Sequence, residues 1–179
     1  MKIFIIVGMP ASGKGIAQEY ARTEGYPYYS TGDIVRSEVK SRGLTPGPEV
    51  TAKVSDELRG PDGMGVTRLA LAKALEQKAS VVFLEGMRSW PEIELIRKQV
   101  EAIVVAFVAP RGLRRQRIIS RGRPDDSPAA FDERDMREIA YGASVPIALA
   151  DAYVLNTKTM EESIEDFHEI VLSYGGPGK

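Results

Sequence analysis

The sequence predicts an α/β fold in which a five-stranded parallel sheet carries helices on both faces. Short apolar runs recur along the chain, as is typical of strands that are buried on both faces of a sheet. Longer stretches of helical character separate these runs and fit helical crossovers between parallel strands. The expected strands are Ile3–Val7, Tyr28–Tyr29, Val81–Leu84, Ile103–Val108 and Ala152–Leu155. Catalytic loops in such a sheet cluster at the carboxyl ends of the strands.

The helices between these strands begin with recognisable signals. A helix is expected from Gly15 to about Ala21, directly after the first strand. Two further starts, Ser89-Trp-Pro-Glu92 and Thr159-Met-Glu-Glu162, have the form of a capping box, in which the hydroxyl and the acid satisfy each other's backbone N–H groups. The last helix therefore follows the last expected strand without a long loop.

The composition fits one domain. The chain has 179 residues, of which 43% are hydrophobic and 27% charged, enough for a single well-packed core. The net charge of −1 argues against a general nucleic-acid coat protein. Cysteine is absent, which excludes disulfides and thiol catalysis. We expect a cytoplasmic protein without a membrane partner, because no stretch is long and apolar enough to span a bilayer.

Two stretches are typical of insertions that cover a site within a single domain of residues 1–179. Residues 32–62 include proline and glycine clusters around a polar helix, which indicates a small helical flap. Residues 122–134 begin with Gly122-Arg-Pro-Asp-Asp-Ser-Pro128 and indicate a short lid. Segments of this kind commonly close on substrate and exclude water.

The first strand runs into Gly8-Met-Pro-Ala-Ser-Gly-Lys14, which has the Walker A spacing G-x-x-x-x-G-K. Glycines let successive N–H groups turn toward one anion, and the following helix adds its positive N-terminal end. Lys14 supplies a mobile charge for the β- and γ-phosphates. A chance glycine-rich turn is the alternative, but the order of strand, loop, lysine and helix argues against it. We therefore expect the P-loop NTPase fold and a site for ATP.

The hydroxyl that usually follows the lysine and ligates Mg²⁺ is missing, because Gly15 and Ile16 stand there. Magnesium must then be held by phosphates, water and carboxylates from elsewhere. Glu85 ends the third strand at the place of a Walker B acid, and Asp33 is the second candidate; both are expected to act through water. An ordinary strand-end turn is the alternative for Glu85.

Other candidates are cationic. Thr31-Gly-Asp-Ile-Val-Arg36 fits either a second anion-binding corner or a capped helix with an exposed arginine, and spacing does not separate the two. Residues 111–123 hold six arginines and no acid, which fits a solvated helix, a nucleic-acid patch or a polyphosphate clamp. Arg117 and Arg121 stand four apart and share a helix face. Arg134 and Arg137 add two more cations beyond the lid.

Together these segments resemble the adenylate kinase family of P-loop nucleoside monophosphate kinases, and most closely a set of archaeal adenylate kinase-related proteins. The phosphate loop is similar, including its proline, although the family usually has threonine where Ile16 stands. Ser30-Thr-Gly-Asp-Ile-Val-Arg36 is similar to the family's monophosphate-binding segment. Glu85-Gly-Met-Arg88 resembles a shortened Asp-Gly-Phe-Pro-Arg, and Arg123-Pro-Asp-Asp126 followed by Arg134 keeps the lid spacing.

The resemblance implies a role for each position that matches. The expected catalytic residues are Lys14, Arg88, Arg121, Arg123 and Arg134. The expected ATP-binding residues are Gly8, Pro10, Ala11, Ser12, Gly13, Lys14, Gly15, Ile16, Arg117, Asn156 and Thr157. The expected residues for the acceptor are Thr31, Gly32, Asp33, Arg36, Gly86, Met87, Arg88 and Arg137.

The expected activity is ATP-dependent phosphorylation of a nucleoside monophosphate, with AMP giving ADP, and Mg²⁺ as the metal. One alternative is a kinase with a hydroxyl acceptor, similar to dephospho-coenzyme A kinase, in which Asp33 or Glu85 would be the base. A second alternative is a nucleotide-binding switch or assembly factor with weak catalysis, which would have a ribosomal, RNA or protein partner. The sequence does not rank AMP against CMP, UMP or dGMP.

Overall fold

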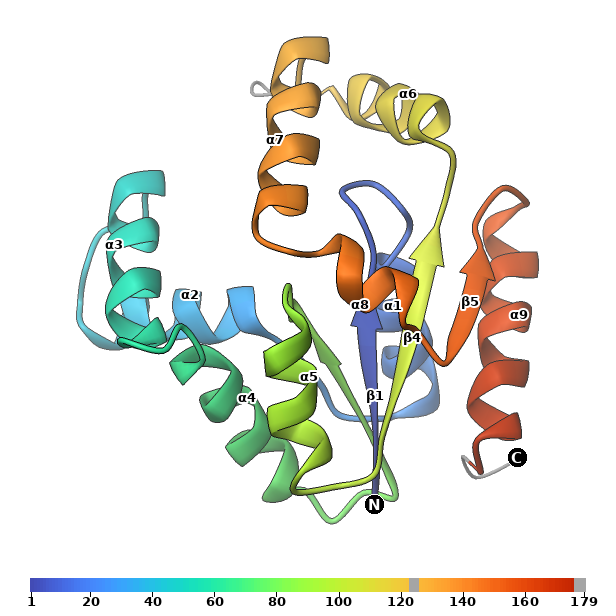
Figure 1. Cartoon of the computed structure of the whole chain (residues 1–179), viewed down its shortest axis with the longest axis horizontal. Coiled ribbons are helices and arrows are strands. Elements are labelled where there is room, and N and C mark those ends of the chain that lie inside the picture. The colour runs from blue at the N-terminus through green and yellow to red at the C-terminus, as the bar shows by residue number, and fades with distance from the viewer. Residues whose placement is uncertain (123–125, 176–179) are drawn as a thin grey trace.

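A computed structural model describes residues 1–122 and 126–175 and confirms the predicted α/β fold (Figure 1). Five parallel strands form one sheet in the order β2-β3-β1-β4-β5. The strands are β1 (Lys2–Val7), β2 (Tyr28–Ser30), β3 (Val81–Glu85), β4 (Ala102–Val108) and β5 (Ala152–Leu155). Each expected strand is present, with its ends shifted by no more than one residue.

The apolar runs are buried because the sheet is covered on both faces. In the central strand β1, Ile5 pairs with Leu84 of β3 on one side and with Val104 of β4 on the other. Ile3 and Ile5 belong to the core cluster on one face, whereas Phe4 and Ile6 belong to the cluster on the opposite face. This alternation follows from the two-residue period of a strand, and it fixes the register of the sheet.

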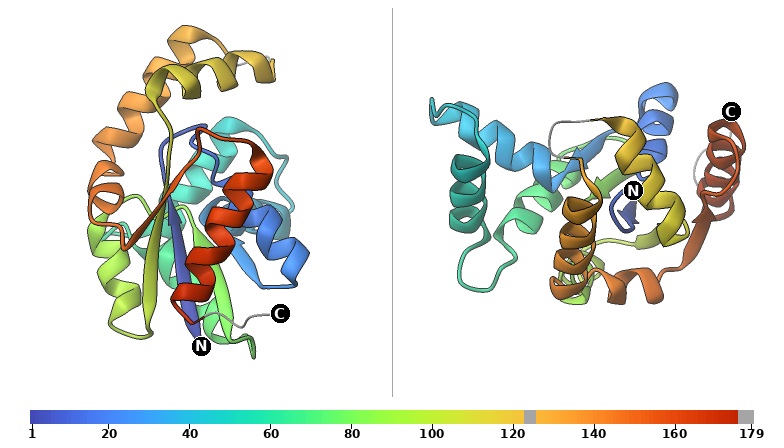
Figure 2. Two further views of the ribbon diagram at one scale, coloured as in Figure 1. Left: turned by 90° about the vertical axis from the view of Figure 1, so that its right-hand side faces the viewer. Right: turned by 90° about the horizontal axis from the view of Figure 1, so that it is seen from above.

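Helices form a layer on each face (Figures 1 and 2). The helices α1 (Gly15–Glu24) and α9 (Met160–Ser173) cover one face. The helices α4 (Gly65–Leu75), α5 (Trp90–Arg97) and the short α8 (Ser144–Ala148) cover the other. The predicted capping boxes at Ser89 and Thr159 are both present at the starts of α5 and α9.

Four helices stand around the carboxyl ends of the strands (Figure 1). The helices α2 (Thr31–Ser41) and α3 (Pro48–Arg59) project to one side of the sheet. The helices α6 (Arg111–Arg121) and α7 (Pro128–Ala140) form a hairpin above β4. Both pairs adjoin the end of β1, where the phosphate loop begins. In the described ranges, none of these helices combines the length and the apolar character that a membrane crossing requires.

Candidate active site

The phosphate loop joins β1 to α1 and adopts a backbone that only particular residues tolerate. Gly8 has φ +152° and Gly13 has φ +106°. Ala11, with φ +59°, is the one non-glycine residue with a positive φ in the described part of the chain. Within the same part, no acceptor is found for the N–H groups of Gly13, Lys14 and Gly15. These donors, at the N-terminus of α1, are therefore available to an anion.

Neighbouring atoms, a side chain in one case and a backbone carbonyl in the other, leave room only for glycine at two loop positions. A Cβ at Gly13 would lie 1.8 Å from Nδ2 of Asn156, which donates to the carbonyl of Ser12 at 2.9 Å. A Cβ at Gly8 would lie 2.5 Å from the carbonyl oxygen of Phe107. The loop is thus held closely against the ends of β4 and β5.

The side chain of Lys14 lies against the first residues of the phosphate loop. Its Nζ donates to the carbonyl of Gly8 at 2.7 Å and lies 4.0 Å from Oε1 of Glu85. Burial lowers the pKa of Lys14, while the carboxylates of Glu85 and Glu138 oppose this shift. A phosphate placed here would favour the charged ammonium and would compete for it with the loop carbonyl.

A pocket of about 550 Å³ lies against the loop, and we call it the donor pocket after the predicted role of its lining residues. Eight of the predicted ATP-binding residues line it, namely Ala11, Ser12, Gly13, Lys14, Gly15, Ile16, Arg117 and Asn156. Gly8 and Pro10 line a smaller neighbouring cavity instead. Thr157 does not line either space, and its role stays a prediction.

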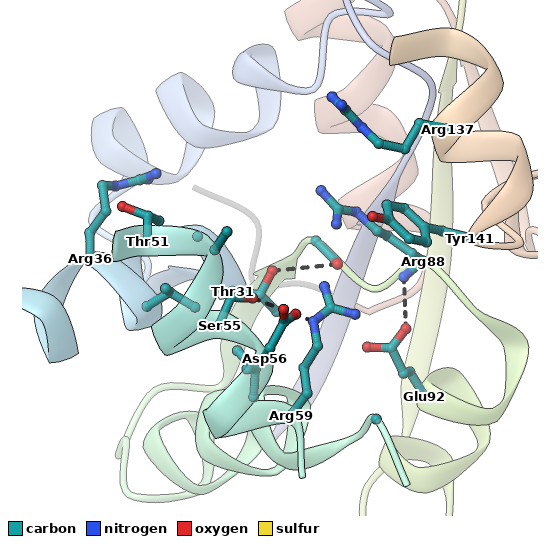
Figure 3. A pocket seen from close by; sticks show the side chains of 16 residues that line it. Thr31, Arg36, Thr51, Ser55, Asp56, Arg59, Arg88, Glu92, Arg137 and Tyr141 are labelled. Atoms are coloured by element: carbon teal, nitrogen blue, oxygen red, sulfur yellow. Dashed lines mark hydrogen bonds between the residues drawn. The ribbon is translucent and has the colours of Figure 1, made fainter. Parts of the chain in front are cut away.

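A second pocket of about 510 Å³ lies between α2, α3, the end of β3 and α7, and we call it the acceptor pocket after the predicted role of its lining residues (Figure 3). The structure brings six of the predicted acceptor ligands together here, namely Thr31, Gly32, Arg36, Gly86, Arg88 and Arg137. Arg59, which the sequence reasoning missed, adds a fourth guanidinium to the lining. Met87 is buried and lines the smaller cavity, whereas Asp33 lies outside the lining of the acceptor pocket.

Asp33 uses both carboxylate oxygens within its own helix turn. Oδ2 accepts from the hydroxyl of Ser30 at 2.7 Å, and Oδ1 accepts from Arg36 at 2.6 Å. Partial burial raises the pKa of Asp33, but the hydrogen bonds from Ser30 and Arg36 outweigh it, so that the pKa lies below its usual value. Asp33 is thus an ionised residue of the first turn of α2, and its predicted role with metal stays a prediction.

Glu85 fits the expected magnesium site better. Its Oε2 accepts from the phenol of Tyr28 at 2.9 Å, and Oε1 faces Lys14. Gly15 and Ile16 offer no hydroxyl, and the described residues hold no cluster of three or more metal-ligating side chains. Among the described residues, Glu85 would thus be an oriented carboxylate for a bound Mg²⁺, with phosphate oxygens and water as further ligands. The metal there would neutralise phosphate charge.

A third cavity of about 170 Å³, here called the connecting cavity, shares lining residues with each of the two pockets. Lys14 and Glu85 line both this cavity and the donor pocket. Gly86 and Arg88 line both this cavity and the acceptor pocket. The wall of this cavity therefore includes residues of both pockets, among them Lys14 and Arg88.

Two of the predicted catalytic arginines, Arg121 and Arg134, contact the carboxylate of the same residue, Asp126. Arg121 donates to Asp126 through two bonds of 2.9 and 2.7 Å, and Arg134 lies 3.3 Å from the same carboxylate. Asp126 is fully buried at its side chain. Arg121 also lines the donor pocket, whereas Arg134 does not line any of the three spaces. Arg123, predicted to be catalytic, lies outside the described residues.

Two further charged residues of the site were not predicted. Glu138 of α7 lies 3.0 Å from Arg88, whose guanidinium also stacks 5.3 Å from the ring of Tyr141 (Figure 3). Arg114 of α6 is 6% exposed and pairs with the buried Asp135 of α7. Of the alternatives for the arginine-rich stretch, a solvated surface is wrong for Arg114. The sequence carried no signal that singles out Arg114, because several of the arginines in this stretch stand three or four residues apart.

Comparisons with known proteins place the chain in a family. A family profile described as an AAA domain matches residues 7–132. UPF0200 proteins of Methanosarcina mazei and Thermococcus onnurineus are 35% and 39% identical, over 97% and 94% of this chain and 96% of each relative. The chain belongs to the UPF0200 family. These relatives are archaeal, which agrees with the archaeal resemblance.

Solved structures show the same fold. The structure of TT1252 from Thermus thermophilus has a TM-score of 0.72 and 18% identity, with 98% of each chain covered. Shikimate kinase from Acinetobacter baumannii in complex with shikimate has a TM-score of 0.62 and 16% identity, covering 97% of this chain and 94% of that one. The UPF0200 chain therefore has a P-loop kinase-like fold. Its likeness to adenylate kinases in particular stays a prediction.

Proposed function

We propose that this protein transfers the γ-phosphoryl group of ATP to a nucleoside monophosphate, with AMP as the acceptor that gives ADP. The observation that carries the proposal is the connecting cavity between the two pockets. It has Lys14 and Glu85 at the donor side and Gly86 and Arg88 at the acceptor side. Two substrates bound in these pockets would meet there, and phosphoryl transfer depends mainly on such positioning and on charge neutralisation.

The charge of the acceptor pocket favours an anionic acceptor. Its lining holds four arginines and two acids. The acid Glu92 is already committed, because Oε2 accepts from the N–H groups of Arg88 and Ser89 and Oε1 accepts from the hydroxyl of Thr67. A phosphate monoester would therefore meet more guanidinium groups than carboxylates in the lining, of which Arg36 and Arg88 also contact Asp33 and Glu138 outside it. Such an acceptor is already a nucleophilic anion, so it requires no general base.

A hydroxyl acceptor is the second candidate, because shikimate kinases share the fold. This reading requires a base, and Asp33 is poorly suited to it. Its lowered pKa makes it a weak proton acceptor, and both of its oxygens already accept hydrogen bonds. Glu85 is then the remaining candidate for the base.

The test incubates the purified protein with ATP, Mg²⁺ and one acceptor at a time: AMP, CMP, UMP, dGMP, dephospho-coenzyme A or shikimate. Products are separated by anion-exchange chromatography. Formation of two ADP from ATP and AMP supports the proposal. Phosphorylation of a hydroxyl compound with no turnover of monophosphates overturns it in favour of the second candidate. Tight ATP binding without any transfer would instead indicate a nucleotide-binding switch.

A matched pair of variants ties the activity to the acceptor pocket. Arg88→Met is expected to raise the KM for AMP by about tenfold or more, because a charged hydrogen bond to phosphate is lost. Arg68→Met changes an exposed arginine of α4 that pairs with Asp62 and does not line the described pockets. It should leave the KM unchanged. Equal KM values in both variants would remove Arg88 from the acceptor site.

A further inference from the structure

The carbonyl oxygens of the phosphate loop are all occupied by donors from the protein itself. Lys14 donates to the carbonyls of Gly8 and Met9 at 2.7 and 3.4 Å. The next three carbonyls, which belong to Pro10, Ala11 and Ser12, accept from Arg114, Arg117 and Asn156 at 3.2, 3.4 and 2.9 Å respectively. We call the carbonyls of residues 10–12 the rim of the loop. Side chains from α6 and from the end of β5 thus hold this rim.

This rim matters because a peptide unit has two orientations with opposite electrostatic effects. When the carbonyls of Pro10 and Ser12 are held by side chains, the N–H groups of Ala11 and Gly13 that follow them are left for the anion, whereas the N–H of Ser12 donates to the carbonyl of Met9 at 3.1 Å. A peptide that turned over would direct an oxygen at the phosphate and repel it. Ala11 has φ +59°, a conformation that costs about 1–2 kcal/mol for a residue other than glycine. The loop therefore needs outside contacts to keep this backbone.

Arg114 makes several further contacts beside its hydrogen bond to the rim. It is 6% exposed, and its Nε also donates to the carbonyl of Ala109 at 3.3 Å. Its guanidinium pairs with both carboxylate oxygens of Asp135 and lies 5.4 Å from the ring of Phe131. One buried side chain thus ties together the phosphate loop, the end of β4 and helix α7.

We infer that Arg114 is a positioning residue, which holds the peptide after Pro10 in its anion-binding orientation and couples the loop to the α6–α7 hairpin. This inference rests on the proposed binding of ATP at the loop. Arg114 does not itself line the donor pocket, so its effect on nucleotide affinity would be indirect. In the same way, phosphate binding at the loop would be transmitted through Asp135 to α7, which carries Arg134 and Arg137.

The chain offers a closely matched control. Arg111 lies on the same helix, contacts the same Asp135 carboxylate at 3.3 Å and stacks on the same Phe131 ring at 5.3 Å. It makes no hydrogen bond to the loop among the described residues. Arg111→Met therefore removes an ion pair to the same carboxylate and a contact with the same ring, from a more exposed position, and leaves the rim intact.

The experiment measures the ATP affinity of Arg114→Met and Arg111→Met by calorimetry, and the affinity for AMP in parallel. Arg114→Met is expected to weaken ATP binding by about tenfold, since a charged hydrogen bond and the loop orientation are lost together. AMP affinity should stay unchanged in both variants, and ATP affinity should stay within about twofold in Arg111→Met.

A merely structural role predicts a different pattern, in which Arg114→Met weakens ATP and AMP binding alike and lowers the melting temperature to match. That pattern, or equal ATP affinity in the two variants, overturns the inference. If Arg114→Met does not fold, Arg114→Lys and Asp135→Asn take its place, with a smaller loss of ATP affinity expected from each. If the unaltered protein binds no ATP, the proposed function itself fails. This outcome differs from a failure of the inference, in which the unaltered protein binds ATP and the variants show one of the two contrary patterns.

Discussion

Nε of Arg88 lies 3.0 Å from a carboxylate oxygen of Glu138. A protein carboxylate therefore holds the guanidinium that we expect to bind the acceptor phosphate. Glu138 reaches Arg88 from α7, so its carboxylate competes with an acceptor phosphate for the charge of this arginine. The ion pair is half-buried, with side chains 39% and 18% exposed.

Removing this competition should tighten acceptor binding. Glu138→Gln is expected to lower the dissociation constant for AMP by about two- to fivefold, the range for a partly exposed ion pair. Glu133→Gln, at an exposed position of the same helix, is the matched control and should have no effect. Calorimetry with AMP measures both. Unchanged or weaker AMP binding in Glu138→Gln would show that Glu138 does not compete with the acceptor.

Only glycine fits at position 13, because of both the positive φ there and the neighbouring side chain of Asn156. Gly13→Ala combines φ +106° with a Cβ placed 1.8 Å from Nδ2 of Asn156. We expect it to lower the free energy of unfolding by at least about 2 kcal/mol and to abolish detectable ATP binding. Gly25→Ala, with φ +74° and open space around its Cβ, should cost only about 1 kcal/mol and leave ATP binding intact. Urea denaturation and calorimetry compare the two, and similar losses in both would contradict this view of the loop.

Lys14 should take up a proton when nucleotide binds at alkaline pH. Burial lowers its pKa in the free protein, and phosphate oxygens beside the ammonium would raise it again. ATP affinity should therefore fall as pH rises through the lowered pKa. Calorimetry at about pH 9.5, just below the ordinary lysine pKa, in buffers of different ionisation enthalpy reports the proton directly. Lys14→Met should remove the uptake; the same uptake in that variant would assign the proton to another group.

Tyr20 should control the stability of the protein at high pH. Burial raises the pKa of Tyr20 to about 12, and its hydroxyl lies 2.9 Å from Nδ1 of His168. Because the folded pKa lies above the unfolded value of about 10, this stabilisation is present below pH 10 and is lost as pH rises toward 12. Tyr20→Phe should flatten the alkaline fall in the free energy of unfolding, leaving the part due to Tyr28, whose pKa burial also raises. An unaltered slope in Tyr20→Phe would refute the assignment.

The sheet could be predicted from the sequence because its strands are buried on both faces. The burial of a strand such as Ile103–Val108 can be inferred from its own apolar residues, without information about distant parts of the chain. The capping boxes at Ser89 and Thr159 were predictable for a similar reason, since both partners lie within one turn. The phosphate loop combined a local motif with a local strand and helix.

The ion pairs of the site could not be predicted from the sequence, because the two residues of each pair lie far apart along the chain. Arg114 meets Asp135 across 21 positions, and Arg88 meets Glu138 across a still longer separation. A run of six arginines gives no local reason to choose which one is buried. The choice depends on how α6 and α7 pack, and only the tertiary structure supplies that. The predicted boundaries of the flap and lid stay predictions for the same reason.

The central claim is that one donor pocket and one acceptor pocket open onto the same cavity between Lys14 and Arg88. A compound in which two adenosines are joined through a chain of five phosphates would span both pockets and tests this most directly. We predict that it binds with a stoichiometry of one, and that its binding is prevented both by ATP and, separately, by AMP. Competition with ATP alone, or two independent binding events, would contradict the claim that the pockets are joined.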